Sequence, residues 1–370
     1  MAVIVVPFAL ATLVGLAVLW PEQSSVPVPE AIGPQPLRAE AVVVRTEVVP
    51  CPGADEGAPP ECSAITARIA TGRDQGDTVE LQQTGDPSLG RLEAGDRIVV
   101  AELAGDEPGA GWYFEDYARR RPLLLLGVLF AVAVTLLGRG RGLLALVGLA
   151  FSLLLLIRFV LPSILEGNDP VAVALVGSAA IMFVALYLAH GFNVRTTSAV
   201  AGTLISLVLT GLLAGAFVHL TNLTGLGSEE GSYLRALAGN IDLEGLLLGG
   251  IVVGSLGVLD DVTVTQASAV WELSLANANY GFRQLYQGAL RIGRDHIAST
   301  VNTLVLAYAG ASLPLLVLFT LSNRHLGDVL SGEIVAEEIV RTLVGSIGLV
   351  ASVPITTALT AFVATRQRAE

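Results

Sequence analysis

The chain has 370 residues and a formal net charge of −12, from 21 basic and 33 acidic side chains. Charged residues make up 15% of it and hydrophobic residues 53%, against about 25% and 45–50% in ordinary soluble domains. This composition excludes a single soluble globule, a disordered protein and a nucleic-acid binder. The whole charge excess lies in residues 21–116, which hold 18 acids and 6 arginines. The sequence therefore indicates a membrane protein with one acidic domain in water.

Eight apolar runs reach, or nearly reach, the roughly 20 residues that a helix needs to cross a bilayer core about 30 Å thick. We expect an all-α polytopic bundle of about eight transmembrane helices. Residues 1–20 form its N-terminal anchor, 21–118 an acidic extracytoplasmic β domain, and 119–370 a seven-helix membrane domain. The first run lacks the positive start of a signal peptide, so a retained anchor is favoured over a cleaved one. The runs are Val3–Trp20, Leu123–Leu137, Leu143–Leu161, Val171–Ala189, Ala199–Leu220, Leu246–Val264, Ile297–Leu318 and Leu343–Ala364.

Arginine placement predicts the orientation, because the sequence contains no lysine. With both termini in the cytoplasm, most arginines near span ends fall on the inner side, as the positive-inside rule expects. The run Arg119–Arg121 is the exception, and it follows a long translocated domain. The inner arginines are Arg139, Arg141, Arg195, Arg283, Arg291, Arg294, Arg366 and Arg368.

The acidic domain has the pattern of a small β-barrel. Five short runs rich in β-branched or aromatic residues are separated by Gly-Asp turns, which favours a closed, OB-like barrel. Cys51 and Cys62 both fall in this domain, and a disulfide between them is favoured over two buried thiols. The acidity is either a solvated surface or a means of recruiting cations, and it argues against nucleic acid. The runs are Ala41–Val49, Ser63–Ala70, Thr78–Gln83, Arg97–Glu102 and Trp112–Tyr117.

Two carboxylates, Asp260 and Asp261, lie about 15 residues into the sixth apolar run, or roughly 22 Å along a helix. An ionisable side chain at this depth is costly and is a functional hypothesis by default. Residues spaced i, i+4, i+7 and i+11 share one face of a helix, so further polar residues align with the second carboxylate. This polar stripe consists of Asp261, Thr265, Ser268 and Glu272.

The start of the seventh run carries two more polar lines, preceded by Arg291 and Arg294. If the two helices pack together, their carboxylates, hydroxyls and histidine form a path for a proton or a cation. Alternatively, the acids pair with the arginines, the histidine faces lipid headgroups, and the hydroxyls bond to their own backbone. We expect the connection Trp271–Asp295 to be an amphipathic surface helix. The two lines are Asp295, Ser299 and Asn302, and His296, Thr300 and Thr303.

Enzyme signatures are absent from the sequence. It contains no G-x-S-x-G elbow, no phosphate loop and no H-E-x-x-H, and its four histidines show no metal-ligand spacing. We therefore predict no catalytic residue, no metal and no cofactor. An intramembrane enzyme is the weakest alternative.

The segment GVLDDVTVTQASAVWEL, followed by ALRIGRDHIASTVNTLVLAYAGASLPLL, resembles the YibE/F family of bacterial membrane proteins. GFNVRTTSAVAGTLISL and YFEDYARRRPLLLL resemble its actinobacterial form. The resemblance covers nearly the whole chain and implies a multi-span plasma-membrane protein described as a permease. A fainter likeness to half of an RND-type protein, such as SecD or SecF, implies proton flow through the Asp-bearing helices.

These observations together predict a transporter or ion-coupled protein in the lipid bilayer that acts on an unknown solute or ion. The alternative is a non-transporting accessory or scaffold protein that works through its outer β domain. Neither the substrate nor the oligomeric state is specified by these patterns. The predicted pathway residues are Asp260, Asp261, Thr265, Glu272, His296, Ser299, Thr300 and Asn302, with Arg291, Arg294 and Asp295 as charge partners.

Overall fold

The computed structural model describes residues 2–22, 36–49, 62–84, 92–102, 111–239, 241–321 and 325–367. The chain forms two compact units, one of residues Pro29–Ala133 and one of Met1–Val28 with Val134–Glu370. The first unit holds a small sheet and the second a helical bundle. The boundary falls inside the long helix α2 (Arg120–Leu155), whereas the sequence predicts it at 118/119, where the last strand gives way to helix.

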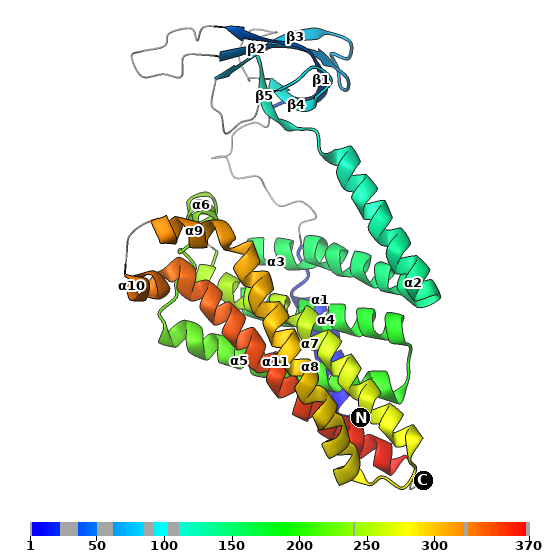
Figure 1. Ribbon diagram of the computed structural model, residues 1–370. Helices are drawn as coiled ribbons and strands as arrows, with labels where there is room; N and C mark the ends of the chain where they lie inside the picture. Colours follow the sequence, from blue (N-terminus) through cyan, green and yellow to red (C-terminus); the bar gives the residue numbers. More distant parts are fainter. Residues whose placement is uncertain are drawn as a thin grey trace. The chain divides into compact units, whose positions relative to one another are not determined.

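The sheet unit contains five antiparallel strands in the order β3-β2-β1-β4-β5 (Figure 1). Alternate residues of the strands, such as Ala41, Val43, Ile98 and Val100, are buried in one apolar core, as expected for strands with one solvated face. Two of the predicted Gly-Asp turns have glycines at positive φ, which other residues rarely adopt. The strands are β1 (Arg38–Val49), β2 (Cys62–Ile69), β3 (Thr78–Thr84), β4 (Arg97–Glu102) and β5 (Trp112–Tyr117).

All five predicted strands are therefore confirmed, with small differences at their ends. Cys62 begins β2, but Cys51 lies outside the described residues, so the disulfide stays a prediction.

The bundle unit contains long apolar helices. In the described part of the chain, five helical segments are long and apolar enough to cross a membrane, and α8 with α9 would add a sixth if this bent pair forms one span. The five are Arg120–Leu165, Pro170–His190, Val194–Leu220, Leu243–Ala276 and Glu333–Arg366. The helices not yet given are α1 (Ala2–Val18), η3 (Leu156–Val160), α3 (Leu161–Leu165), α4 (Pro170–His190), α5 (Val194–Leu220), α6 (Glu229–Leu237), α7 (Leu243–Ala276), α8 (Phe282–Ala311), α9 (Leu313–Leu321), α10 (Leu326–Ser331) and α11 (Glu333–Arg366).

Two predicted runs, Leu123–Leu137 and Leu143–Leu161, are joined in the segment Arg120–Leu165. The helix is interrupted between them at Arg139, which has φ 51° and ψ −134°. Gly142 then lies directly against the preceding turn, because a Cβ at this position would stand 2.3 Å from the carbonyl oxygen of Val134. The glycine-rich sequence Gly138–Gly142 thus turns the chain sharply rather than continuing one straight helix.

Helix starts follow from capping side chains. Asp169 accepts a hydrogen bond from the backbone N–H of Val171, Asn193 accepts one from Thr196, and Asp242 accepts one from Gly245. Each satisfies an N–H group that has no partner within its own helix.

The prediction of a separate amphipathic helix at Trp271–Asp295 is wrong. Helix α7 continues to Ala276 and α8 begins at Phe282, so this segment consists of the ends of two long helices. The turn between them closes with hydrogen bonds from Asn277 N–H to Leu273 and from Tyr280 N–H to Asn277. A polar face at the end of a long helix has the same periodicity as a surface helix, which explains the error.

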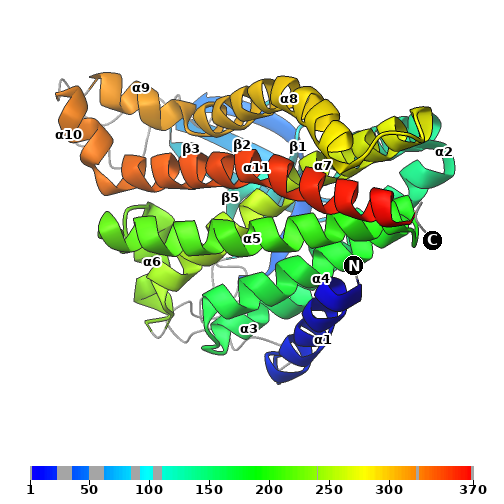
Figure 2. The ribbon, with the colours of Figure 1, turned by 90° about the horizontal axis from the view of Figure 1, so that it is seen from below.

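Helices α5, α7 and α11 pack against one another and form the centre of the bundle. Figure 2 shows α11 between α5 and α8. Small residues permit the closest approach: a Cβ at Gly202 would lie 2.1 Å from Thr356 Oγ1, and one at Gly348 would lie 2.0 Å from Thr210 Oγ1. These two contacts join α5 and α11 by the close packing of small residues that is typical of membrane helices.

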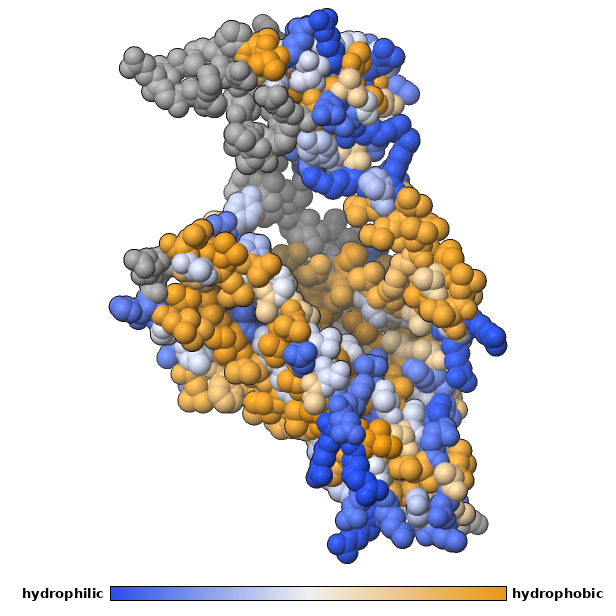
Figure 3. Space-filling model, viewed as in Figure 1, coloured by the Kyte–Doolittle hydropathy of each residue, from blue (hydrophilic) through white to orange (hydrophobic). Residues whose placement is uncertain are grey.

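Large apolar side chains cover much of the outside of the bundle. Leu212 and Leu220 on α5 are 68% and 69% exposed, and Leu316 to Leu318 on α9 are also exposed. Figure 3 shows hydrophobic side chains along α9 and the flank of the bundle, and hydrophilic ones at the end where α8 begins. Apolar surface of this extent needs lipid rather than water around it, so the protein is embedded in a membrane.

Candidate functional site

Asp260 and Asp261 lie near the middle of α7, about 26 Å from its start. Because successive residues of a helix point about 100° apart, the two side chains have different surroundings. Asp260 is half-buried, and its Oδ1 atom is buried without a hydrogen-bond partner. Asp261 is exposed. Of the two carboxylates, Asp260 is the one held inside the bundle.

The predicted polar stripe of α7 faces outward. Thr265 and Glu272 are exposed together with Asp261, and Ser268 is half-buried. The opposite face of α7, which includes Val252, Leu259, Val262 and Thr263, is buried against neighbouring helices. The periodicity thus identifies a real face of the helix, and this face points away from the centre of the bundle.

The predicted residues of α8 are also divided. His296 and Thr300 are half-buried, and the Thr300 hydroxyl donates to the His296 carbonyl oxygen at 3.0 Å. His296 Nε2 is buried without a hydrogen-bond partner. The other predicted members are exposed, namely Arg291, Arg294, Asp295, Ser299 and Asn302.

Between described residues, no hydrogen bond or ion pair joins the polar residues of α7 to those of α8 that the sequence singled out. The charge pairing of Arg291 and Arg294 with the two aspartates therefore stays a prediction. A path for a proton or cation that is formed by both helices also stays a prediction.

Gln266 makes the connection between these helices that sequence reasoning missed. Its Nε2 donates to the Ala289 carbonyl oxygen of α8 at 2.7 Å and to Thr357 Oγ1 of α11 at 2.8 Å. Gly293 of α8 lies against the same amide, because a Cβ there would stand 2.8 Å from Gln266 Oε1. An amide inside an otherwise apolar span was the available signal, since such groups bond across helices.

A set of buried hydroxyls lies in the centre of the bundle beside Asp260. Thr203 of α5 and Thr263 of α7 share a hydrogen bond of 2.6 Å, and Thr263 also donates to the Asp260 carbonyl oxygen. The hydroxyls of Ser206 and Thr356 are buried without a partner, like that of Thr360. These groups offer neutral oxygen donors and acceptors that lipid does not reach.

The hydroxyls of α5 were overlooked because their span is mainly apolar. Thr203, Ser206 and Thr210 are nevertheless spaced i, i+3 and i+7, which places them on one helix face. On α11, Thr356, Thr357 and Thr360 are fully buried. Within the described ranges, no group of three or more His, Cys, Asp or Glu side chains is arranged to hold a metal ion.

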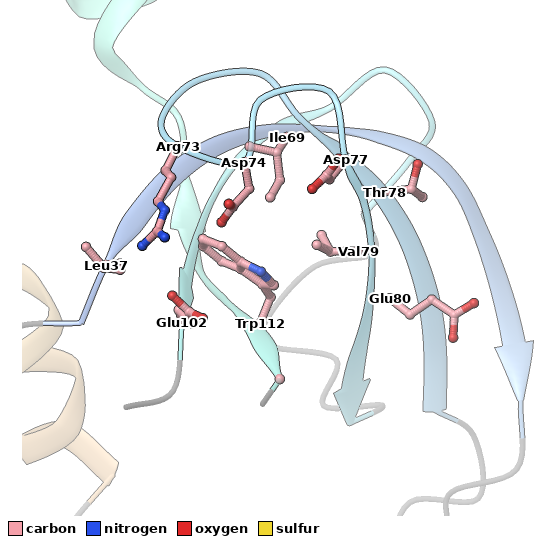
Figure 4. Close-up of a pocket in the computed structure, with 11 residues that line it drawn as sticks. Leu37, Ile69, Arg73, Asp74, Asp77, Thr78, Val79, Glu80, Glu102 and Trp112 are labelled. Atoms are coloured by element: carbon pink, nitrogen blue, oxygen red, sulfur yellow. The ribbon is translucent and has the colours of Figure 1, made fainter. Parts of the chain in front are cut away.

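The sheet unit contains a separate cavity of about 520 Å³. Figure 4 shows the Trp112 indole in this cavity, with Asp74, Arg73 and Glu102 near it. Asp77 and Glu80 line the side formed by the start of β3. The cavity thus combines an aromatic wall with four carboxylates and one guanidinium, a combination suited to a cationic ligand.

Comparison with known families identifies the chain. Residues 126–366 match the YibE/F-like protein family. No curated protein and no solved structure matches the chain. The matched region begins in α2, ends with α11, and includes Asp260, Asp261 and the buried hydroxyls. The chain belongs to the YibE/F-like family.

Proposed function

We propose that the protein is an ion-coupled membrane transporter, a permease, in which Asp260 and Asp261 bind the proton or cation. The observation that carries this proposal is the buried, unpartnered Oδ1 atom of Asp260 in the middle of a membrane helix. A buried carboxylate without a partner is unfavourable, and a bound proton or cation removes that cost. The Thr263 hydroxyl bonds to the backbone carbonyl oxygen of Asp260 and to the Thr203 hydroxyl, so neutral oxygen atoms that can serve as ligands lie close to the backbone of this residue.

The pathway in this proposal follows the outward-facing polar residues of α7 and the polar residues of α8. Asp261, Thr265 and Glu272 line it on α7, and His296, Ser299, Thr300 and Asn302 line it on α8. The buried Nε2 atom of His296 supports a role in proton transfer, since it lacks a fixed partner. Arg291, Arg294 and Asp295 balance charge in the first half of α8.

We further propose eight membrane spans in a bacterial plasma membrane, with both termini in the cytoplasm. The segment Arg120–Leu165 has 46 residues, about twice the 20 that one span needs, and it is interrupted at Arg139. It is therefore counted as two spans. The anchor α1 and the bent pair α8 and α9 complete the eight.

Contacts within the bundle support this arrangement, in which successive spans cross the membrane in alternate directions. The Ser163 hydroxyl donates to the Leu19 carbonyl oxygen after α1, and Leu223 packs with Leu247 and Val340. Leu19, Ser163 and Leu223 belong to loops or helix ends that the proposal puts outside, and Leu247 and Val340 lie near the starts of α7 and α11 on the same side. The arginine cluster that seemed misplaced is partly neutralised, because Arg119 donates to Asp116 at 2.5 Å. This bond lowers the pKa of the Asp116 carboxyl below its usual range.

The alternative function is a non-transporting accessory or scaffold that acts through the sheet unit. The cavity around Trp112 is the observation that favours it. The strand order β3-β2-β1-β4-β5, with β3 and β5 also in contact, supports an OB-like barrel, a fold that binds ligands on its surface. A cationic partner is the ligand that its carboxylates favour.

The transport proposal is tested with the full-length chain in proteoliposomes that contain a pH-sensitive dye. An imposed sodium or pH gradient drives flux, and Asp260→Asn and Asp261→Asn are compared with the parent. We expect Asp260→Asn to reduce flux by about tenfold or more, because the amide cannot carry a proton or an anionic charge. Asp261→Asn is expected to reduce flux less.

Glu244→Gln is the matched control, since it removes an exposed carboxylate from the first turn of the same helix. It is expected to retain parental flux. Unchanged flux in both aspartate variants would rule out the proposed role of these carboxylates.

A further inference from the structure

A second cavity lies at the end of the bundle where α7 and α11 begin. The loop 221–228 folds over this end and is held by Glu333, whose Oε1 accepts hydrogen bonds from both the N–H and the hydroxyl of Thr224, each at 2.6 Å. Gly225 has φ +74°, and a Cβ there would stand 2.5 Å from the Leu243 carbonyl oxygen. The loop is therefore fixed against α7 by a contact that only glycine permits.

The cavity has a volume of about 190 Å³. Pockets for drug-sized ligands are about 300–1,000 Å³, so this one suits a smaller molecule. Its lining includes apolar residues such as Leu234 and Leu246 and a set of polar residues. The polar residues are Ser228, Glu230, Glu337 and Arg341.

Two side chains of opposite charge in this cavity each have one buried atom without a hydrogen-bond partner. Glu337 is only 8% exposed, and its Oε1 atom has no hydrogen-bond partner, although the Gly227 N–H faces the carboxylate. Arg341 Nε is likewise buried and unpartnered. Glu337 and Arg341 are spaced i, i+4 and could pair, but Arg341 Nη1 bonds to Glu338 instead, at 2.9 Å.

These two atoms set the chemistry of a ligand that would fit the cavity. Glu337 needs an N–H or O–H donor, and Arg341 Nε needs an acceptor. An isolated cation would meet the repulsion of Arg341, and an isolated anion would meet that of Glu337 and Glu230. A molecule that carries both an ammonium and an anionic oxygen satisfies both groups, and each bond would be charge-assisted.

We propose that this cavity binds a small zwitterion, with a primary ammonium on Glu337 and an anionic oxygen on Arg341. The same chemistry occurs in an ethanolamine phospholipid headgroup and in a free amino acid or phosphoethanolamine. Leu243, Leu246 and Leu247 near the start of α7 border the cavity, as do Glu337 and Arg341 near the start of α11. In the proposed topology these helix starts lie at the outer surface of the membrane, where headgroups meet the protein.

The test uses the full-length chain in nanodiscs of phosphatidylglycerol, which lacks an ammonium group. Glycine and phosphoethanolamine are added in solution, and binding is measured from the shift of the thermal unfolding midpoint. In a parallel arm, phosphatidylethanolamine or phosphatidylcholine is included in the nanodiscs, and bound lipid is counted by native mass spectrometry. A primary ammonium can donate to Glu337 and a quaternary one cannot, so phosphatidylcholine is expected not to bind.

Glu337→Gln and Arg341→Gln are each expected to weaken binding by about tenfold or more. Glu244→Gln and Arg235→Gln make the same charge changes on exposed residues outside the cavity lining, and they are expected to bind like the parent. The midpoint without ligand shows that each variant is folded.

Binding of glycine or phosphoethanolamine would identify a soluble ligand, and retention of phosphatidylethanolamine alone would identify the headgroup. Either result supports the proposal if the two cavity variants lose it. Failure of all these probes to bind, or equal binding by Glu337→Gln and the parent, would overturn it.

Discussion

At the scale of single residues, the close contact between Gly202 and Thr356 gives the sharpest prediction of stability. A Cβ at position 202 would lie 2.1 Å from Thr356 Oγ1 and 3.0 Å from its Cβ, so Gly202→Ala forces α5 and α11 apart. We expect it to destabilise the protein by about 1–3 kcal/mol, as overpacking does in well-packed cores. Thermal unfolding in detergent measures the change.

Two further variants separate this clash from a general effect of alanine. Gly215→Ala lies on the same helix with no atom within 4 Å of the new Cβ, so it is expected to be neutral or slightly stabilising. Adding Thr356→Ala to Gly202→Ala removes the hydroxyl and is expected to restore part of the loss. If Gly202→Ala and Gly215→Ala unfold at the same temperature, the close packing described for this pair is wrong.

The aspartate pair shows how far residue patterns alone can be interpreted. Spacing identified Asp261, Thr265 and Glu272 as one face of a helix, and that face exists. Periodicity is the same whether a polar face points inward or outward, so it could not tell that Asp260 is the more buried carboxylate. Gln266 and Thr203 were missed for a related reason, because their partners lie on helices distant in sequence.

At the scale of elements, helix α2 carries a prediction about topology. Arg139 interrupts it, and the proposed eight-span arrangement puts this turn in the cytoplasm. We therefore expect Gly140→Cys, where a Cβ meets no atom within 4 Å, to react with an impermeant maleimide only after cells are permeabilised. Glu229→Cys, at the exposed start of α6, is expected to react in intact cells. Both variants are made with Cys51 and Cys62 replaced by serine.

The reverse labelling pattern would invert the orientation. Labelling of both positions in intact cells would contradict the three crossings that the proposal puts between them, in the second half of Arg120–Leu165, α4 and α5. The sequence predicted the runs on either side of this turn, since apolar length is a strong signal. It also predicted the strands of the sheet unit from their alternation and glycine turns. Helix ends were less well predicted: α7 extends twelve residues beyond Val264, because polar residues continue a helix that is supported by packing.

At the scale of the whole molecule, the excess of acidic residues lies in residues 21–116, most of which belong to a unit distinct from the one that holds Asp260. The membrane unit resembles its family over residues 126–366, which excludes the sheet. Family membership thus bears on the bundle alone. Composition pointed to the acidic sheet as the unusual part, but the buried polar groups lie in the bundle.

The two functional hypotheses therefore predict opposite responses to removal of the sheet unit. If the bundle transports an ion, a variant in which a short flexible linker replaces Arg38–Tyr117 retains flux in proteoliposomes, while Asp260→Asn abolishes it. The sheet has its own apolar core, so its removal is expected to leave the bundle folded, which the thermal unfolding midpoint verifies.

If the protein is instead an accessory factor, deletion of the sheet abolishes its effect in cells, while Asp260→Asn and Asp261→Asn preserve it. A complementation assay separates these outcomes. The sheet-deletion variant, Asp260→Asn and Asp261→Asn are each expressed in a strain from which the gene for this protein has been deleted. Each hypothesis requires a result that the other forbids.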